Sequence, residues 1–238
     1  MITIYCLDIS GISTETYQKF YSIVSEERKV KADKFHFPED SKRCVFGEIL
    51  LRYGLFQFLG YTPKLCIDYN QYGKSHLKNL QGFSYNLSHS GRWVVFAYGS
   101  SELGVDVEKI VYDHDNKGIA DRFFSPAERQ FICSATDKCT RARRFTQTWT
   151  LKESYIKYLG TGLSTSLDSF STSIADGLVR DSENNIDKYA RLNSYLLDDD
   201  YYLSICSRDH TASILTVTAA ELLDIFDSLV SRESRPPA

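Results

Sequence analysis

Residues of the same or similar type recur one hundred positions apart in the helical segments of this chain. The matched positions are Ser25 and Ser125, Leu51 and Leu151, Arg52 and Lys152, Phe56 and Ile156, Leu59 and Leu159, and Gly60 and Gly160. One interpretation is chance matching between two amphipathic helices. The other is an α+β fold of two similar α+β halves, related by a pseudo-twofold axis, with a ligand site between them. The halves would be residues 1–102 and 103–238.

Periodicity and turn residues divide both parts of the chain into strands and helices. Helices are predicted over Asp40–Leu59, ended by Gly60, and over Arg144–Leu159, ended by Gly160, with further helix starts at Ser25 and Ser125. Strands are predicted over residues 2–9, 65–69, 83–88, 93–98, 103–107, 170–174, 191–196, 201–206 and 212–217. The polar, proline-containing residues from about 231 to 238 are expected to fray.

Composition excludes several classes of protein. A formal net charge of -3 over 238 residues gives no sign of a nucleic-acid binder. The six cysteines form no Cys-x-x-Cys pair, so we expect buried, reduced thiols rather than a zinc site. The first residues read as a strand rather than a signal peptide, and no apolar run approaches the roughly 20 residues of a membrane span. A cytoplasmic protein is expected.

Two short segments have the residue types of a phosphate-handling site. Gly104–Glu108 reads Gly-Val-Asp-Val-Glu, which places Asp106 and Glu108 on one face of a strand. Trp149–Lys157 contains Glu153 and Lys157 four residues apart, on one face of a helix. Three carboxylates and a lysine brought together would bind a hard cation and clamp phosphate.

Each of these pairs also has a simpler interpretation. Alternate carboxylates on a strand often form a solvated face, although the apolar residues opposite Asp106 and Glu108 leave the acidic side for water, a cation or a cleft. Glu153 and Lys157 have the spacing of an ordinary exposed helix ion pair. An apolar stripe beside that pair, formed by Trp149, Ile156 and Leu159, instead suggests a packed boundary.

Three further features are weaker signals taken singly. His89 stands at a strand end between two serines and is either structural or an anion ligand. Gln71–Lys74 forms a turn that could bring a lysine to phosphate. The basic cluster in the first part of the chain is either a solvated helix face or a surface for a polyanion; it contains Arg28, Lys29, Lys31, Lys34, Lys42 and Arg43.

Taken together, the segments closely resemble the Sfp-type 4'-phosphopantetheinyl transferases. That family's pattern, Gly-[Ile/Val]-Asp-[Ile/Val]-Glu followed by Trp-[Ser/Thr]-x-Lys-Glu-[Ser/Ala]-x-x-Lys, fits residues 104–108 and 149–157 without a mismatch. Tyr72–Lys74, Asn86–Trp93 and Arg122–Ser125 match as well, in order, over nearly the whole chain. The resemblance implies the two-halved fold, coenzyme A as substrate, and Mg²⁺ on its pyrophosphate.

Site residues follow from the resemblance position by position. The implied metal ligands are Asp106, Glu108 and Glu153. The implied catalytic residues are Glu153, as base directly or through a water, and Lys157, at the reacting phosphate. The implied coenzyme A ligands are Arg28, Lys31, Lys74, Ser88, His89 and Lys157. Two positions depart from the family: Ser75 replaces the usual proline, which loosens the Lys74 turn, and Cys44 replaces a hydroxyl residue near the 3'-phosphate.

The resemblance also implies the reaction and the partner. The enzyme would move the phosphopantetheine arm of coenzyme A onto a serine of an apo acyl or peptidyl carrier protein, in fatty-acid, polyketide or nonribosomal-peptide synthesis. We expect a monomer that binds neither nucleic acid nor membrane, with Phe123 and Phe124 as candidates for a carrier-docking rim or for the core. Two alternatives stay open: a non-catalytic coenzyme A or carrier-binding module of the same fold, and a Mg²⁺-dependent phosphodiesterase.

Overall fold

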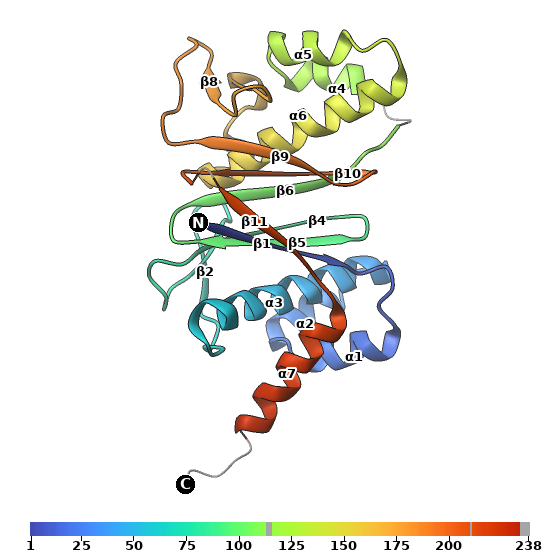
Figure 1. The fold of residues 1–238 in the computed structure, drawn as a ribbon, viewed down its shortest axis with the longest axis vertical. Helices are drawn as coiled ribbons and strands as arrows, with labels where there is room; N and C mark the ends of the chain where they lie inside the picture. The colour runs from blue at the N-terminus through green and yellow to red at the C-terminus, as the bar shows by residue number, and fades with distance from the viewer. Residues whose placement is uncertain (113–115, 210, 234–238) are drawn as a thin grey trace. The chain divides into compact units, whose positions relative to one another are not determined.

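The computed structural model describes residues 1–112, 116–209 and 211–233, which fold into helices and β-sheets (Figure 1). Its residues group into two compact units that interleave along the chain. The first unit comprises residues 1–3, 65–91 and 97–213, and the second comprises residues 4–64, 92–96 and 214–238. The predicted α+β class is confirmed. The pseudo-twofold axis and the division at residue 102 stay predictions.

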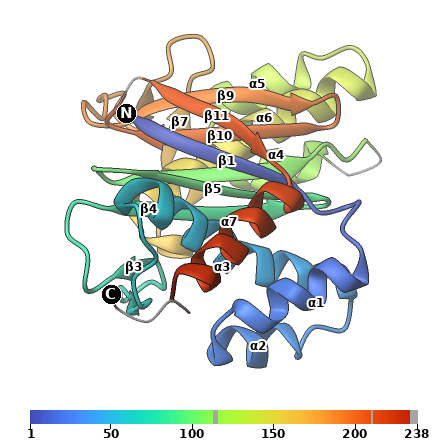
Figure 2. The ribbon, with the colours of Figure 1, turned by 60° about the horizontal axis from the view of Figure 1, so that its bottom comes forward.

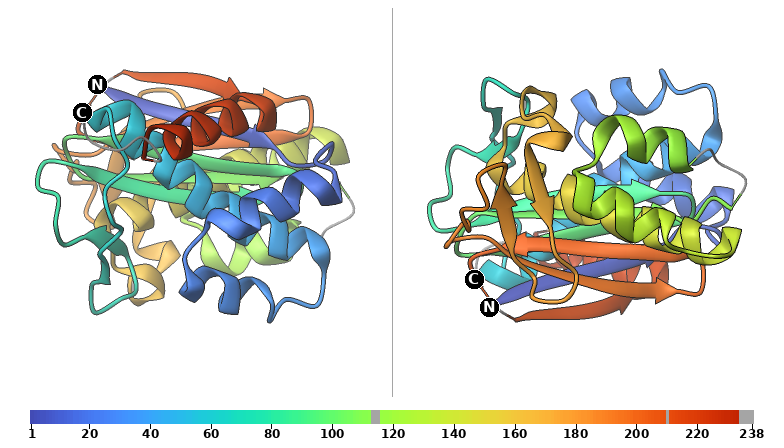
Figure 3. Two further views of the ribbon diagram at one scale, coloured as in Figure 1. Left: turned by 90° about the horizontal axis from the view of Figure 1, so that it is seen from below. Right: turned by 90° about the horizontal axis from the view of Figure 1, so that it is seen from above.

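The first unit is built on an antiparallel sheet in the order β6 (Leu103–Lys109), β10 (Tyr201–Ser207) and β9 (Arg191–Asp198). The long helix α6 (Lys138–Leu159) covers one face of this sheet, and α4 (Asn116–Phe123) and α5 (Pro126–Cys133) pack against α6 in turn (Figures 1 and 3). Trp149 of α6 is partly buried and packs against two separate core clusters.

Shorter elements surround this sheet and helix. Strand β4 (Ser84–Ser90) packs beside β6, and two small hairpins are formed by β2 (Ile67–Tyr69) with β3 (Ser75–Leu77) and by β7 (Phe170–Thr172) with β8 (Val179–Asp181). Single 3₁₀ turns, η1 (Gly162–Ser164) and η2 (Leu167–Ser169), connect α6 to β7. The side chains of Leu151, Tyr155 and Ile156 on α6 form the main core cluster with residues of β7–β10.

In the second unit, β11 (Ala212–Val217), β1 (Ile2–Asp8) and β5 (Trp93–Gly99) lie side by side in that order. Its helices are α1 (Thr14–Ile23), α2 (Glu26–Ala32), α3 (Pro38–Leu59) and α7 (Ala219–Glu233). Phe20 of α1 links this helix to α3 and α7, because its ring contacts Phe46 of α3 at 5.0 Å and Phe226 of α7 at 6.3 Å between centroids. Figure 2 labels these three helices. Aromatic edge contacts of this kind stabilise a core beyond the burial of area.

The repeat at one hundred residues has a local structural counterpart. Helices α3 and α6 span Pro38–Leu59 and Lys138–Leu159, and each ends at a glycine in the left-handed region. Ser25 and Ser125 cap α2 and α5, and each accepts a hydrogen bond from the amide three residues later. The serine and glycine matches are therefore helix caps, which are set by local sequence, and the other matched positions lie within α3 and α6.

Several sequence predictions need correction. Helix α6 begins at Lys138 rather than Arg144, because Asp137 caps it. Helices α1, α4 and α7 and strands β3 and β8 were not predicted. Residues 231–233, expected to fray, belong to α7, and residues 234–238 lie outside the described part.

The cysteines are free thiols, as expected, but burial holds only for some of them. Cys6, Cys44 and Cys206 are buried, whereas Cys133 and Cys139 are exposed, since they stand at the outer ends of α5 and α6. In the described residues, no helix combines the length and the apolar character needed to span a membrane.

Candidate active site

Strand β4 bonds to β6 through side chains rather than through backbone pairing. The amides of alternate β6 residues point away from β10, and polar side chains of β4 accept them: Val105 N to Asn86 Oδ1 at 3.0 Å, Val107 N to Ser88 Oγ at 3.2 Å, and Lys109 N to Ser90 Oγ at 3.2 Å. Unpaired edge amides need such partners when they are buried. Every second residue of β4 is therefore aligned with a fixed position on β6.

The same two serines hold the carboxylates of the Gly-Val-Asp-Val-Glu segment. Ser88 Oγ donates to Asp106 Oδ1 at 2.9 Å, and Ser90 Oγ donates to Glu108 Oε2 at 2.7 Å. Each hydroxyl thus accepts a backbone N–H and donates to a carboxylate, which uses both of its roles and leaves it little freedom to turn. Asp106 is 3 % exposed, so its carboxylate lies beneath neighbouring elements rather than on a solvated strand face.

Lys157 reaches this strand from α6. Its Nζ donates to Asp106 Oδ1 at 2.6 Å and to Ser88 Oγ at 3.0 Å. The ion pair that the structure gives to Lys157 therefore runs to a strand 51 residues earlier in the chain, not to Glu153 on its own helix. Gly104 permits this approach, because α6 passes over it with backbone against backbone. The two motifs of the sequence meet at this contact.

The carboxylates carry more negative charge than the site neutralises. Burial and the neighbouring Asp106 raise the pKa of Glu108 to about 7, although Ser90 and Lys157 act in the opposite direction. Burial and Asp106 likewise raise the pKa of Glu153, against the effect of Lys157. Asp106 Oδ2 is buried without a hydrogen-bond partner. The three acids thus share one lysine and leave one oxygen unsatisfied.

These features bear on whether a cation fits. The donor set is entirely carboxylate oxygen, the preference of Mg²⁺, and the unsatisfied Asp106 oxygen is what a cation would relieve. As the side chains stand, however, no three His, Cys, Asp or Glu groups in the described chain come together closely enough to ligate one ion. The charge balance fits a cation, and convergence of Asp106, Glu108 and Glu153 on it stays a prediction.

Two cavities adjoin the site. The first has a volume of about 340 Å³ and is lined by Tyr72, Gly73, Lys74, Ser75, Asn86, Leu87, Glu153, Ile156, Lys157, Gly160 and Gly162. The second, of about 300 Å³, is lined by Glu108, Lys109, Val111, Asn116, Ile119, Phe145, Thr146 and Trp149. Glu153 and Lys157 therefore face a cavity of mixed polar and apolar lining that also contains the predicted Tyr72–Lys74 turn, whereas Glu108 lines a more apolar one.

The other predicted ligands lie in different surroundings. His89 is exposed and, by strand alternation, lies on the opposite face of β4 from Ser88. Arg28 and Lys31 belong to the second unit. There Arg28 Nε contacts Glu48 Oε2 at 3.4 Å, and its Nη1 contacts Cys44 Sγ at 3.7 Å. The role of His89, Arg28 and Lys31 as coenzyme A ligands stays a prediction.

Phe123 and Phe124, considered above for a docking rim or for the core, differ in burial. Phe124 is buried in a core cluster with Ala120 and Ile132, and its ring stacks on Phe145 at 5.4 Å. Phe123 is exposed and is the one that a docking partner could reach.

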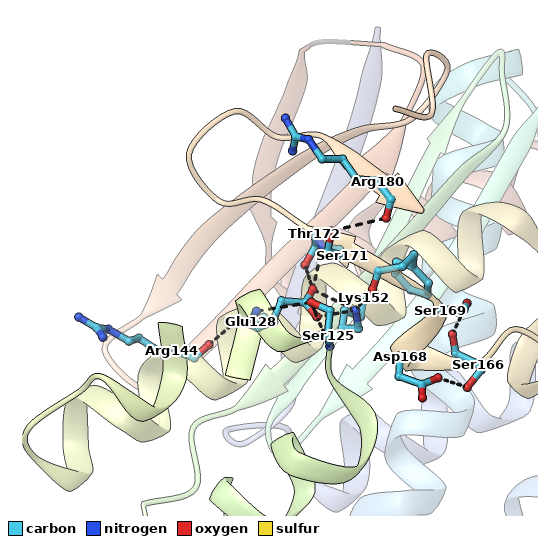
Figure 4. A network of polar contacts seen from close by, with 12 residues as sticks. Ser125, Glu128, Arg144, Lys152, Ser166, Asp168, Ser169, Ser171, Thr172 and Arg180 are labelled. Atoms are coloured by element: carbon cyan, nitrogen blue, oxygen red, sulfur yellow. Dashed lines mark hydrogen bonds and ion pairs between the residues drawn. The ribbon is translucent and has the colours of Figure 1, made fainter. Parts of the chain in front are cut away.

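A buried ion pair beside the site was missed by the sequence analysis. Lys152 and Glu128 are 0 % and 4 % exposed, and Lys152 Nζ lies 2.9 and 2.8 Å from the two carboxylate oxygens (Figure 4). Lys152 Nζ also donates to Phe170 O at 2.7 Å, while Ser125 and Thr172 donate to Glu128. The signal was present, since Glu128 completes the Ser125 capping box, but its long-range partner was not predictable from spacing.

Comparisons with known proteins agree on one family. A family model described as the 4'-phosphopantetheinyl transferase superfamily matches residues 102–206, and one described as 4'-phosphopantetheinyl transferase, N-terminal, matches residues 12–101. The 4'-phosphopantetheinyl transferase Sfp of Bacillus subtilis (strain 168) is 33 % identical over 216 residues, which cover 89 % of this chain and 95 % of the relative.

Two further relatives carry similar names. A 4'-phosphopantetheinyl transferase of Bacillus pumilus is 31 % identical over 80 % of this chain and 81 % of its own. One from Aneurinibacillus migulanus is 32 % identical over 67 % of this chain and 65 % of its own. The similarity to the first relative spans both compact units.

Proposed function

This chain belongs to the 4'-phosphopantetheinyl transferase superfamily, and we propose that it transfers the 4'-phosphopantetheine group of coenzyme A to a serine of an apo acyl or peptidyl carrier protein. Adenosine 3',5'-bisphosphate is the other product. The observation that carries the proposal is the contact of Lys157 with Asp106 and Ser88, which brings both family motifs to one point beside the 340 Å³ cavity.

The residues of this chain supply the proton transfer and part of the charge. A serine hydroxyl is a weak nucleophile and needs a base. Glu153 takes that role, directly or through a water, and burial favours it because a raised pKa makes the carboxylate a better proton acceptor. Lys157 places a positive charge at the phosphate under attack. The serine oxygen bonds to the pantetheine-side phosphorus as the bond to the leaving bisphosphate breaks.

Asp106, Glu108 and Glu153 are the residues that would hold Mg²⁺. When bound, the cation would offset the negative charge of the coenzyme A pyrophosphate. The unsatisfied Asp106 oxygen and the raised pKa of Glu108 support this assignment, because both features express a shortage of positive charge.

Coenzyme A would occupy the 340 Å³ cavity, with Lys157 toward its phosphates and the Lys74 turn at the nucleotide end. Ser88, which is bonded to Lys157, is proposed as a further ligand. Arg28, Lys31 and His89 are proposed as further ligands from their positions in the family pattern. We also propose a cytoplasmic monomer without membrane or nucleic-acid partners. Carriers of fatty-acid, polyketide and nonribosomal-peptide synthesis are all candidate substrates.

One reaction separates this proposal from its alternatives. The full-length chain is incubated with coenzyme A, Mg²⁺ and an apo carrier domain, and the carrier is weighed by mass spectrometry. A mass gain of one phosphopantetheine supports the transferase. Hydrolysis of coenzyme A without carrier would support a phosphodiesterase, and binding without any reaction would support a non-catalytic module.

A further inference from the structure

The turn Asn70–Lys74 forms one wall of the 340 Å³ cavity and is closed by its own first residue. Asn70 Oδ1 accepts the amides of Tyr72 and Lys74, both at 2.9 Å. The same side chain also leaves the turn, because Asn70 Nδ2 donates to Gly160 O at 2.7 Å. Gly160 ends α6, so the turn is attached to the end of the helix that carries Lys157.

Lys74 makes the second attachment. Its Nζ donates to Tyr158 O at 3.1 Å, to Leu103 O at 3.2 Å and to Glu102 Oε2 at 2.6 Å. An ammonium group has three protons, and these three bonds account for all of them. The Lys74 side chain is only 15 % exposed. Its charge is therefore directed at three protein acceptors.

The acceptors explain why a lysine is used here. Tyr158 lies in the last turn of α6, whose carbonyl groups have no partner within the helix. A cation at this end also interacts favourably with the helix dipole. The two carbonyls fix the position of the ammonium group, and Glu102, which is 62 % exposed, adds the opposite charge from the start of β6.

The end of α6 is also shaped to receive this side chain. Gly160 has φ +66°, and a Cβ at that position would lie 2.8 Å from Lys74 Cδ and 3.1 Å from Asn70 Nδ2. The absence of a side chain at Gly160 thus leaves room for both attachments. Lys157 stands three residues before this glycine, so the turn that caps the helix also holds the helical turn that presents Lys157.

We propose that Lys74 is a positioning residue and that Glu102 orients it: together they cap α6 and fix the cavity wall and Lys157, while the Lys74 ammonium makes no bond to a phosphate of the ligand. This inference rests on the proposed function, because it takes the cavity to be the coenzyme A site. It assigns a role to Glu102, which no sequence motif singles out.

Calorimetry with coenzyme A and with 3'-dephospho-coenzyme A tests the proposal without turnover. If Lys74 is a positioning residue, Lys74→Met should raise the dissociation constants of both ligands by the same factor, about tenfold for a lost helix-end contact. It also predicts that Glu102→Gln raises both constants about threefold, and that the double variant binds no worse than Lys74→Met alone.

The opposite pattern identifies a phosphate ligand. If Lys74 bound the 3'-phosphate, Lys74→Met would weaken coenzyme A more than 3'-dephospho-coenzyme A. If it bound any phosphate, Glu102→Gln, which releases Lys74, would leave binding unchanged or tighten it. Either result overturns the inference while the proposed function stands. If the wild-type chain binds neither ligand, the proposed function fails and the inference with it.

A matched control lies on the same hairpin. Lys78 Nζ pairs with Asp68 Oδ2 at 3.1 Å in an exposed position. Lys78→Met removes a charge of the same kind from the same hairpin and should leave both dissociation constants unchanged. A thermal melt of each variant confirms that differences in binding are not losses of fold.

Discussion

A Cβ on Gly104 would overlap the carbonyl oxygen of Ser154, because α6 lies with its backbone directly on β6 at this point. The amide nitrogen of Tyr158 is equally close to that position. Neither group can swing away as a side chain would. The glycine of the Gly-Val-Asp-Val-Glu segment therefore sets the distance between strand and helix, and with it the reach of Lys157 to Asp106.

Gly104→Ala is accordingly expected to push α6 away from β6. Overpacking of this kind lowers the free energy of unfolding by about 1–3 kcal/mol. We expect turnover of an apo carrier to fall at least tenfold, roughly 1.4 kcal/mol of barrier, since the Lys157–Asp106 contact would lengthen. Denaturant melts and initial rates provide the measurements.

Gly11→Ala is the control, because nothing lies within 4 Å of a Cβ there and its backbone does not have a positive φ. Equal rates for the two variants would show that the close approach at Gly104 has no catalytic importance.

Asp106→Asn tests the carboxylate that both Ser88 and Lys157 contact. The amide keeps the shape but removes the charge, so turnover should fall about 100-fold or more, as for the loss of a central electrostatic group. Stability should change little, because the variant loses an ion pair but also relieves the crowding of acids that raises the pKa of Glu108. Wild-type kcat in this variant would exclude Asp106 from the metal site, whereas Asp68→Asn should leave kcat unchanged.

Local signals in the sequence predicted much of the fold. Ser25 and Ser125 were recognised as helix starts, and Gly60 and Gly160 as helix ends, because caps depend on a few neighbouring residues. The first turns of α6 were missed for the complementary reason. Residues 138–143 are mostly polar and basic, so their periodicity is weak, and only the Asp137 cap marks the start.

Contacts between distant segments could not be predicted from the sequence. The spacing of the sequence suggested a pair of Lys157 with Glu153, whereas the structure pairs Lys157 with Asp106. This pairing is possible because Gly104 lets β6 approach the backbone of α6 closely. Lys74 was expected at phosphate, and its ammonium bonds to the end of α6. Motifs identify which residues matter, but the acceptor of a long, flexible side chain depends on packing.

The raised pKa of Glu108 predicts a pH dependence of stability. The folded value, about 7, lies above the ordinary 4.5, so the folded state binds more protons between these values. The free energy of unfolding of the metal-free chain should therefore fall as pH rises from 4.5 to 7, by at most ~3 kcal/mol, and then level off. Urea melts in EDTA measure it.

Glu108→Gln isolates this effect, because the amide resembles the protonated acid at every pH. The difference in unfolding free energy between variant and wild type should grow across the same window. A difference that is constant with pH would contradict the prediction. Adding Mg²⁺ at pH 8 should stabilise the wild type more than the variant if the carboxylates hold the cation.

The Lys152–Glu128 pair predicts a large loss of stability with a specific partial rescue. Lys152→Met leaves the Glu128 carboxylate buried without its cation. Breaking a buried pair in this way should lower the free energy of unfolding by about 3–5 kcal/mol. Lys152→Met/Glu128→Gln removes both charges and keeps an oxygen that can accept from Ser125 or Thr172, so it should be more stable than the single variant. Turnover need not follow stability, because α6 also positions Glu153 and Lys157.

The pair of Arg180 and Asp176, at 2.6 Å with side chains 25 % and 41 % exposed, provides the comparison. Arg180→Met should leave the unfolding midpoint unchanged, since exposed ion pairs contribute little. If the double variant at residues 128 and 152 is stable but transfers phosphopantetheine slowly, the buried pair positions α6 for catalysis. If stability and turnover recover together, its role is confined to the fold.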